Sequence, residues 1–414
     1  MKILIILALF FTSQLMAFDA QFWGELQKYP TPKWRLGQSF EKTKAKPILF
    51  EGEPYNGKAT EIFAFYCTPS MLDGNKTKDK NLPAIVCVHG GGGRAYPQWV
   101  ELWAKRGYAA IAIDWRGNGN EPRFKNPTEE ERKKYGAYKL TERIHLKNGI
   151  PEHNAQTTSL DDGKSERDAW AYHAISAIIR AHSLIRSFEE VDKECTAITG
   201  ISWGGYLTSL VSAIDTRFKA AVPVYGCGYI YEFPENWAKY IGKKNIQRWI
   251  SLFDPSKSLQ ARTMPMLFVN SPTDRWYPLS IWTKSTNLAN AKTLIISTLK
   301  HSHEHGWNVP EIEAFIASQI NGGEPLIDLE ELKTDGKSIF CKTTDIAKVD
   351  VAKIFYTTTN DKRLWKDFNW QSAPAQILDN EIRAELPPNT RAAYLSVSDR
   401  KKRAITTNAI ILKP

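Results

Sequence analysis

Short apolar runs alternate with stretches of helical periodicity from about residue 83 to residue 320. Pro83–Val88 and Tyr108–Asp114 are typical of buried strands, and Ser165–Arg186 places its apolar residues on one face of a helix. Strands that alternate with helices form a parallel, doubly wound α/β sheet with helices on both faces. Because ligands of such sheets bind at the carboxyl ends of the strands, we expect the functional residues to lie just after strands. The other elements expected in this region are the helices Trp99–Lys105, Gly205–Ile214 and Pro310–Ile320 and the strands Cys195–Thr199, Lys219–Tyr225, Pro265–Asn270 and Thr293–Thr298.

Three regions depart from this alternation. Gly117–Lys164 is long, polar and charged, which favours a lid or substrate loop over a packing element. Strand-like pieces at Pro47–Phe50 and Glu61–Cys67 are expected to pair with the edge of the sheet or to cover it. Past about residue 326 the helical period disappears, and short alternating strands predict a small β-sandwich. These strands are Ser338–Thr344, Lys353–Thr359, Asn380–Leu386, Ala392–Ser398 and Thr406–Leu412.

The predicted division is an α/β domain over residues 18–325, with an N-terminal β extension and an insertion at 117–164, and a β domain over 326–414. The first 17 residues are predicted to be a signal peptide, because one lysine precedes an apolar run that leads to Ala17 and is too short to span a bilayer. We therefore expect a secreted or periplasmic protein. No later segment reaches about 18 uninterrupted apolar residues, so we expect no integral membrane segment in the mature chain.

Composition excludes several classes of protein. The five cysteines are scattered, odd in number and never in C-x-x-C spacing, which excludes a disulfide framework or a zinc ribbon. One bridge is possible, but thiols buried in strands are the favoured interpretation. The net charge of +10 is spread along the chain, and the one dense basic run, Asp399–Arg403, favours a hairpin turn. We therefore expect a solvated surface and no nucleic-acid partner. The oligomeric state is not indicated by the sequence.

The pentapeptide from Gly200 to Gly204 reads Gly-Ile-Ser-Trp-Gly and fits the G-x-S-x-G pattern. A hydrolytic serine leaves a strand on a tight turn and enters a helix, and a strand precedes and a helix follows Ser202 in the expected order of elements. The sequence therefore predicts that Ser202 is a nucleophile. A plain glycine turn with a bystander serine is the alternative.

A serine nucleophile needs a base and a carboxylate that orients this base, and in this topology both come later in the chain. Asp274 lies on the loop after the strand Pro265–Asn270, so it is the predicted acid. An Asx-type turn before a proline is the other interpretation of Asp274. Glu232, after the preceding strand, is the second-choice acid.

Three histidines lie on the loop after the last expected strand, at His301, His303 and His305. We prefer His303 as the base, because the sequence His303-Glu-His-Gly306 gives it clearance from a small residue three positions on. His301 is the rival. Alternate histidines would share one face of an extended segment and could bind zinc. Because no cluster of carboxylates or cysteines completes such a site, we expect neither a metal nor a cofactor.

The oxyanion hole needs two backbone donors. Trp203, directly after the nucleophile, is expected to supply one, and the glycine run His89-Gly90-Gly91-Gly92-Gly93 the other. Gly91 is the first choice and Gly90 the second, whereas His89 is expected to be a structural hydrogen-bonding residue. Several tryptophans lie close to these loops and are either aromatic walls for sugar rings or aromatic acyl groups, or packing residues. The candidate substrate-binding residues are Trp276, Trp307 and Trp99, with Trp203 and Trp115 also near the loops.

These motifs together resemble the α/β-hydrolase superfamily, and more closely its acetylxylan esterase and prolyl-oligopeptidase-like branch, found in exported bacterial proteins. The resemblance covers roughly residues 50–320, and Gly92-Gly93-Arg94 followed by Tyr96-Pro97 is similar to the oxyanion loop of acetylxylan esterases. The histidine loop is richer in histidine than the esterase pattern, and the insertion has no counterpart. The residues that carry the resemblance are His89–Gly93, Asp114, Arg116, Gly117, Gly200–Gly205, Val224–Gly228, Asp274 and the histidine loop.

The resemblance implies a serine esterase that removes acyl groups, often acetyl, from plant or algal polysaccharides through an acyl-enzyme. It implies Ser202 as nucleophile, Asp274 as acid and His303 as base, with an acylated carbohydrate as the partner. A serine peptidase of prolyl-oligopeptidase type is an alternative, although the absence of the large N-terminal propeller of such enzymes weighs against it. A catalytically silent glycan-binding protein is the other alternative.

Overall fold

The computed structural model describes residues 19–24, 26–74, 78–122, 129, 143–160, 165–233, 241, 244–359 and 369–412. The predicted signal peptide at residues 1–17 lies outside the described residues, and so do large parts of the predicted insertion at 117–164.

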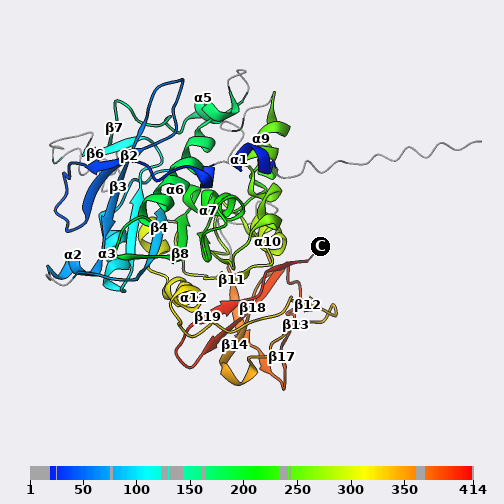
Figure 1. The fold of residues 1–414 in the computed structure, drawn as a ribbon. Coiled ribbons are helices and arrows are strands. Elements are labelled where there is room, and N and C mark those ends of the chain that lie inside the picture. The colour runs from blue at the N-terminus through cyan, green and yellow to red at the C-terminus, as the bar shows by residue number, and fades with distance from the viewer. Residues whose placement is uncertain are drawn as a thin grey trace, which may run out of the picture.

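A sheet of parallel strands forms the centre of the molecule (Figure 1). Parallel pairing joins every neighbour in this part of the sheet, which confirms the predicted doubly wound α/β fold. All residues of the strand Ala109–Ile113 are buried, as expected for a strand that is covered on both faces. In spatial order the strands are β5 (Ala109–Ile113), β4 (Leu82–Val88), β8 (Val191–Ile201), β9 (Ala220–Val224), β10 (Leu267–Asn270) and β11 (Lys292–Ile295).

Helices cover both faces of this sheet (Figure 1). α6 (Trp170–Ile185) and α7 (Trp203–Ile214) pack together on one face, and α3 (Pro97–Lys105) and α12 (Pro310–Ile320) lie on the other. Proline occupies the first turn of α3 and of α12, where its missing N–H costs nothing. Within the described ranges, no helix combines the length and the apolar character needed to cross a membrane. The other α-helices of the described residues are α1 (Ala20–Trp23), α2 (Pro69–Asp73), α5 (Ala155–Thr158), α9 (Ile246–Phe253), α10 (Leu279–Leu288) and α11 (His303–Trp307).

The N-terminal strands extend the sheet beyond β5. β3 (Glu61–Cys67) pairs antiparallel with β5, β2 (Lys46–Glu51) pairs with β3, and β1 (Trp34–Leu36) pairs with β2. This confirms the predicted pairing of the N-terminal strands with the sheet edge. In the described part of the insertion, β6 (Asn118–Pro122) and β7 (Arg143–His145) form a separate antiparallel pair.

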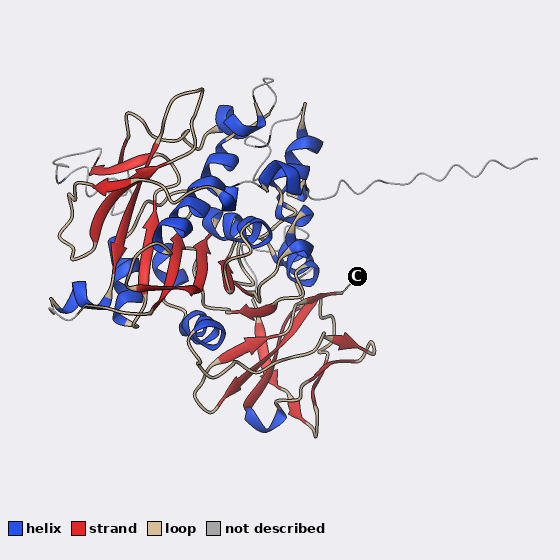
Figure 2. Cartoon of the chain, viewed as in Figure 1, coloured by secondary structure: helices blue, strands red, loops and turns tan. Residues whose placement is uncertain are grey.

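The C-terminal strands form two sheets that pack against each other, seen as the lower strand-rich part of Figure 2. Antiparallel pairing throughout confirms the predicted strand-rich C-terminal region. One sheet contains β12 (Lys333–Thr334), β13 (Ser338–Lys342), β17 (Glu381–Glu385) and β16 (Gln376–Ile377), and the other β19 (Ala404–Thr406), β18 (Ala392–Asp399), β14 (Val349–Thr357) and β15 (Gln371–Pro374), with β20 (Ile410–Ile411) beside β18.

The second of these sheets is continuous with the central sheet. β11 pairs antiparallel with β19, with Thr293 opposite Thr406. The Thr293 hydroxyl donates to the Thr406 carbonyl at 2.7 Å, and the Thr406 hydroxyl donates to the Thr293 carbonyl at 3.2 Å. The domain boundary near residue 326 stays a prediction, but the hydrogen-bonded sheet does not end there.

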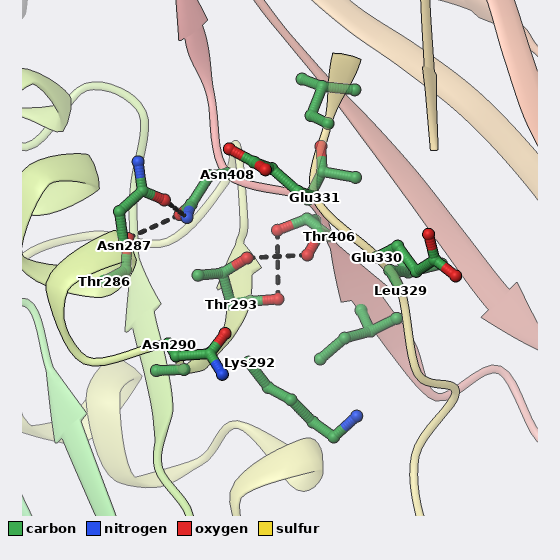
Figure 3. Close-up of a pocket in the computed structure, with 14 residues that line it drawn as sticks. Thr286, Asn287, Asn290, Lys292, Thr293, Leu329, Glu330, Glu331, Thr406 and Asn408 are labelled. Carbon is green, nitrogen blue, oxygen red and sulfur yellow. Dashed lines mark hydrogen bonds between the residues drawn. The ribbon is translucent and has the colours of Figure 1, made fainter. Parts of the chain in front are cut away.

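A cavity of about 370 Å³ lies at this seam (Figure 3). Polar side chains from the two sides of the seam bond to each other around it. Asn408 donates to Asn287 and accepts from the hydroxyl of Thr286. The polar lining therefore joins the C-terminal strands to α10 and β11.

The cysteines agree only in part with the prediction of thiols buried in strands, and the basic run forms the predicted turn. All five cysteines are free thiols, four of them buried, and Cys195 in β8 is half-buried. The basic run forms a hairpin turn between β18 and β19, where the Asp399 carboxylate accepts from the backbone N–H groups of Lys401 and Arg403. Arg403 also pairs with Glu324.

Candidate active site

Ser202 lies on a strained turn between β8 and α7. Its φ of 57° and ψ of −118° are rare for an L-residue. Two backbone hydrogen bonds hold this conformation, from the Ser202 N–H to the Val224 carbonyl and from the Tyr206 N–H to the Ser202 carbonyl, each 2.9 Å long. A Cβ on Gly204 would lie 2.0 Å from the Val88 carbonyl oxygen, so only glycine lets α7 start this close to β4. The turn therefore has the strand–turn–helix context that the G-x-S-x-G pattern requires.

His301 lies between Ser202 and Asp274. Its Nε2 is 2.9 Å from the Ser202 Oγ, and its Nδ1 is 2.5 Å from the Asp274 Oδ2. The other oxygen of Asp274 accepts from the backbone N–H groups of Trp276 and Tyr277, at 2.8 and 2.9 Å. Asp274 thus forms an Asx-type turn with one oxygen and contacts the imidazole with the other. Glu232, the second-choice acid, instead pairs with Lys284.

The preference for His303 as the histidine facing Ser202 is wrong. Helix α11 begins at His303, so the segment is not extended, and His301 precedes the helix. Gly306 packs α11 against Ile201 and Tyr225, so its small size serves helix packing and not a catalytic imidazole. His303 accepts a hydrogen bond from the Gly90 N–H at 2.8 Å.

His305, the third histidine of the loop, bonds through its Nδ1 to the Ser302 hydroxyl at 2.8 Å. The three imidazoles of the loop therefore have three separate sets of partners: Ser202 and Asp274 for His301, the Gly90 N–H for His303, and Ser302 for His305. The zinc alternative assumed an extended segment with all three on one face, which α11 does not provide.

Tyr225 is a site residue that the sequence analysis missed. Its ring stacks on His301 with the centroids 4.4 Å apart, and its hydroxyl donates to the Lys300 carbonyl at 2.5 Å. Its own backbone adopts a φ of 65° directly after β9. The sequence feature that points to Tyr225 is an aromatic residue followed by glycine directly after a strand. It lies in the run Val224–Gly228, which contributes only to the family resemblance above.

The glycine run after β4 lies against the serine turn. A Cβ on Gly90 would lie 3.1 Å from the Ser202 Cβ, and a Cβ on Gly91 would lie 2.5 Å from the Trp203 ring. Because the Gly90 N–H already donates to His303, the second-choice assignment of Gly90 as an oxyanion donor is wrong. Gly91 and Trp203 remain the candidates.

His89 and Trp115 pack beside the glycine run and bond to its backbone. His89 is 1% exposed, and its Nδ1 contacts the Gly90 carbonyl at 2.7 Å. Trp115 stacks on the His89 ring and donates its Nε1–H to the His89 carbonyl. Burial holds the pKa of His89 well below its usual value, so the ring stays neutral.

The candidate substrate-binding tryptophans divide into two groups. Trp99 is 1% exposed and packs on Trp307, so its prediction as a substrate-binding residue is wrong. Trp203 is also buried and lies in an aromatic cluster with Trp170. Trp276 and Trp307 are half-buried and remain candidates.

A second set of a hydroxyl, a histidine and an aspartate lies in the core and resembles a catalytic triad. His182 contacts Asp215 through Nδ1 and the Thr196 hydroxyl through Nε2, both at 2.8 Å. All three residues are 0% exposed, whereas the His301 side chain is 23% exposed. Burial lowers the pKa of His182 to about 4. The hydrogen-bond pattern alone therefore does not mark an active site, because only the set around Ser202 can be reached from solvent.

The sequence profile of the acetyl xylan esterase (AXE1) family matches residues 50–268, more than half of the chain. The chain belongs to the acetyl xylan esterase family. As a member of this family it is a serine carboxylic ester hydrolase, which agrees with the accessible serine on the strained turn. The match includes Ser202 and the glycine run and ends before Asp274 and His301. A search of curated proteins finds no match.

Solved acetyl xylan esterases share the fold of this esterase. The enzyme of a Paenibacillus species aligns with a TM-score of 0.51 and 22% identity, over 72% of this chain and 94% of its own. The enzyme of a Thermoanaerobacterium species aligns with a TM-score of 0.51 and 15% identity, over the same shares. Both alignments support the α/β-hydrolase fold.

Proposed function

We propose that this esterase removes acetyl groups from a polysaccharide or oligosaccharide through Ser202, His301 and Asp274, with a covalent acyl-enzyme. The observation that carries the proposal is the pair of hydrogen bonds that joins the Ser202 hydroxyl to His301 and His301 to the Asp274 carboxylate. All three residues follow strands at the carboxyl edge of the parallel sheet, where ligands of this fold bind.

The geometry supports a two-step acyl transfer. His301 Nε2 removes the proton from the Ser202 hydroxyl as its oxygen attacks the ester carbonyl, and Asp274 stabilises the imidazolium. The backbone N–H groups of Gly91 and Trp203 stabilise the oxyanion. The C–O bond then breaks, and His301 gives its proton to the departing sugar oxygen, which leaves as a hydroxyl group. A water molecule, deprotonated by His301, attacks the acyl-enzyme and releases acetic acid and the free serine.

Acetylated xylan is the first substrate to test, because the family takes its name from the hydrolysis of this polymer. The half-buried rings of Trp276 and Trp307 are proposed to pack against sugar rings. We also propose export of the protein, on the strength of the signal-peptide pattern that ends at Ala17.

The first test measures hydrolysis of an aryl acetate, an acetylated xylan and a proline-containing peptide by the wild type and by Ser202→Ala. We expect the wild type to release acetate from both esters and Ser202→Ala to lose at least about a thousandfold in kcat. Ester turnover that persists in Ser202→Ala would contradict the proposal that Ser202 is the nucleophile. Peptide cleavage without ester turnover would move the assignment to a peptidase.

The second test compares His301→Ala with His305→Ala on the aryl acetate. Removing the base should lower kcat by at least about a thousandfold, whereas removing the exposed imidazole of His305 should leave kcat within about twofold. Equal losses in the two variants would contradict the assignment of His301 as the base.

A further inference from the structure

His303 has a defined place in the site, although its hydrogen bond goes to Gly90 and not to Ser202 or Asp274. Its Nε2 accepts from the Gly90 N–H at 2.8 Å. The ring lies against Tyr96, with the centroids 4.9 Å apart, and at its edge against Trp307. His303 is two residues after His301, so one loop reaches both Ser202 and the glycine run.

The glycine run is shaped around this imidazole. A Cβ on Gly93 would lie 2.5 Å from the His303 Nε2, and a Cβ on Gly90 would lie 3.1 Å from the same atom. Side chains at these positions would displace the ring. The glycines therefore leave the space that the imidazole fills.

Three hydrogen bonds fix both peptide units that flank Gly90. The Gly90 N–H donates to His303, and the Gly90 carbonyl accepts from the Gly93 N–H at 2.8 Å and contacts the Nδ1 of His89 at 2.7 Å. In a trans peptide the C=O and the following N–H point in opposite directions. The fixed Gly90 carbonyl therefore sets the direction of the Gly91 N–H, the first-choice oxyanion donor.

The Gly90 hydrogen bond requires a neutral His303 with its proton on Nδ1, because Nε2 is the acceptor. Burial lowers the pKa of His303 to about 3, with a smaller contribution from repulsion by His301 and Arg94. The ring is therefore neutral at about pH 7, and it cannot replace His301 as a proton carrier at that pH.

We propose that His303 is a positioning residue of the oxyanion hole: it fixes the His89–Gly90 peptide on one side of Gly90, while Gly93 and His89 fix the Gly90 carbonyl on the other side. Together these bonds hold the Gly91 N–H in the orientation that receives the carbonyl oxygen of the substrate. This role rests on the proposed serine esterase mechanism. It also couples the loop that carries the base to the loop that carries the oxyanion donor.

The test uses two substitutions that differ in one property. His303→Gln keeps an acceptor oxygen near the position of Nε2, and His303→Leu removes the acceptor while it fills similar volume. His305→Leu is the matched control on the same loop. We expect His303→Leu to lower kcat on an aryl acetate about tenfold to a hundredfold with a smaller change in KM, because the oxyanion interaction develops in the transition state. His303→Gln should recover most of the loss.

A direct readout of the hydrogen bond separates this role from a general loss of packing. NMR of the ¹⁵N-labelled wild type should show a His303 ring with the proton on Nδ1. The Gly90 amide resonance should shift in His303→Leu and return toward its wild-type position in His303→Gln. Wild-type kcat in His303→Leu, or equal losses in both variants, would overturn the proposal. The NMR readout does not need turnover, so an inactive wild type would count against the proposed function and leave the hydrogen bond measurable.

Discussion

His301 and His303 are separated by one residue and meet different groups. The His301 side chain is 23% exposed and contacts a hydroxyl and a carboxylate. His303 lies beside Tyr96 and the glycine run and accepts from a backbone N–H. A carboxylate partner and access to substrate are what make an imidazole a base, and His303 has neither a carboxylate partner in the described residues nor a contact with the nucleophile.

The sequence predicted Ser202 and Asp274 because each follows a strand in an order that this topology requires. It could not separate the two histidines, because a shift of two residues along a loop changes no periodicity. The short helix α11 decides the outcome, and its five residues are too few to produce a helical pattern. The same limit applies to Trp99, because tryptophan serves both in cores and at binding surfaces.

The buried His182 provides a test at the residue scale. His182→Ala leaves the buried Asp215 without one of its partners, although Arg217 still pairs with it. We expect a loss of about 2–4 kcal/mol in the free energy of unfolding and a kcat within about twofold of wild type. Urea unfolding and aryl acetate turnover below the unfolding midpoint measure both. A large loss of kcat in a folded protein would contradict the structural role of His182.

At the scale of elements, the site depends on how the ends of neighbouring strands are tied together. Tyr225 follows β9, stacks on the base and donates its hydroxyl to the carbonyl of Lys300, the residue before His301. Alternation of strands and helices predicted the strands themselves, since each buried strand carries its own apolar run. It could not predict this cross-connection, because the bond joins residues 75 positions apart.

Tyr225→Phe should loosen the histidine loop and keep the stacked ring. We expect kcat to fall about threefold to tenfold with a loss of about 1 kcal/mol in stability, the contribution of one hydrogen bond. Steady-state kinetics and thermal unfolding test this expectation. Tyr356→Phe, which removes an exposed hydroxyl bonded to Gln371 on the far strands, is the matched control. A kcat equal to that of the control would contradict a role for the Tyr225 hydroxyl.

At the scale of the whole molecule, the C-terminal strands complete the sheet that carries the site. β19 covers the edge of β11, and the Glu311 carboxylate in α12 accepts from the Ala404 N–H at 2.9 Å. The sequence predicted a strand-rich C-terminal region from its alternating pattern. It could not predict the shared sheet, because the choice of a partner for an edge strand depends on tertiary packing and not on local pattern.

Deletion of residues 326–414 should expose the edge of β11, whose chain continues into the histidine loop. Unpaired sheet edges favour aggregation, so we expect the truncated protein to be largely insoluble, with little esterase activity in the soluble fraction. Expression followed by gel filtration measures this. A monomeric truncated protein with wild-type kcat would contradict this prediction, because the site would then not need the C-terminal strands.

The stability of the whole molecule should depend on five histidines that folding holds in the neutral form. Burial lowers the pKa of His153 and His303 to about 3 and of His173 and His182 to about 4, and it holds that of His89 well below its usual value. In the unfolded chain these groups titrate near about 6.5, so the unfolded state binds more protons below that pH.

The free energy of unfolding should therefore be highest above about pH 6.5 and fall as the pH drops toward about 4, where the folded protein begins to protonate. Urea midpoints at about pH 7.5, 6 and 5 measure the trend. His182→Gln should reduce the slope, since it removes one of the groups that bind a proton only on unfolding. A urea midpoint that does not change over this pH range would contradict the prediction that these histidines stay neutral in the folded protein.

Labelling of the serine tests whether His301 activates Ser202 for acyl transfer. The measurement is the rate at which a fluorophosphonate modifies Ser202, followed by intact mass and peptide mapping, in wild type, His301→Ala, His303→Gln and Ser202→Ala. We expect rapid labelling at Ser202 in wild type, a rate within about tenfold in His303→Gln, a loss of at least about a thousandfold in His301→Ala, and no label in Ser202→Ala. Labelling of His301→Ala at the wild-type rate, or modification of a residue other than Ser202, would contradict the account.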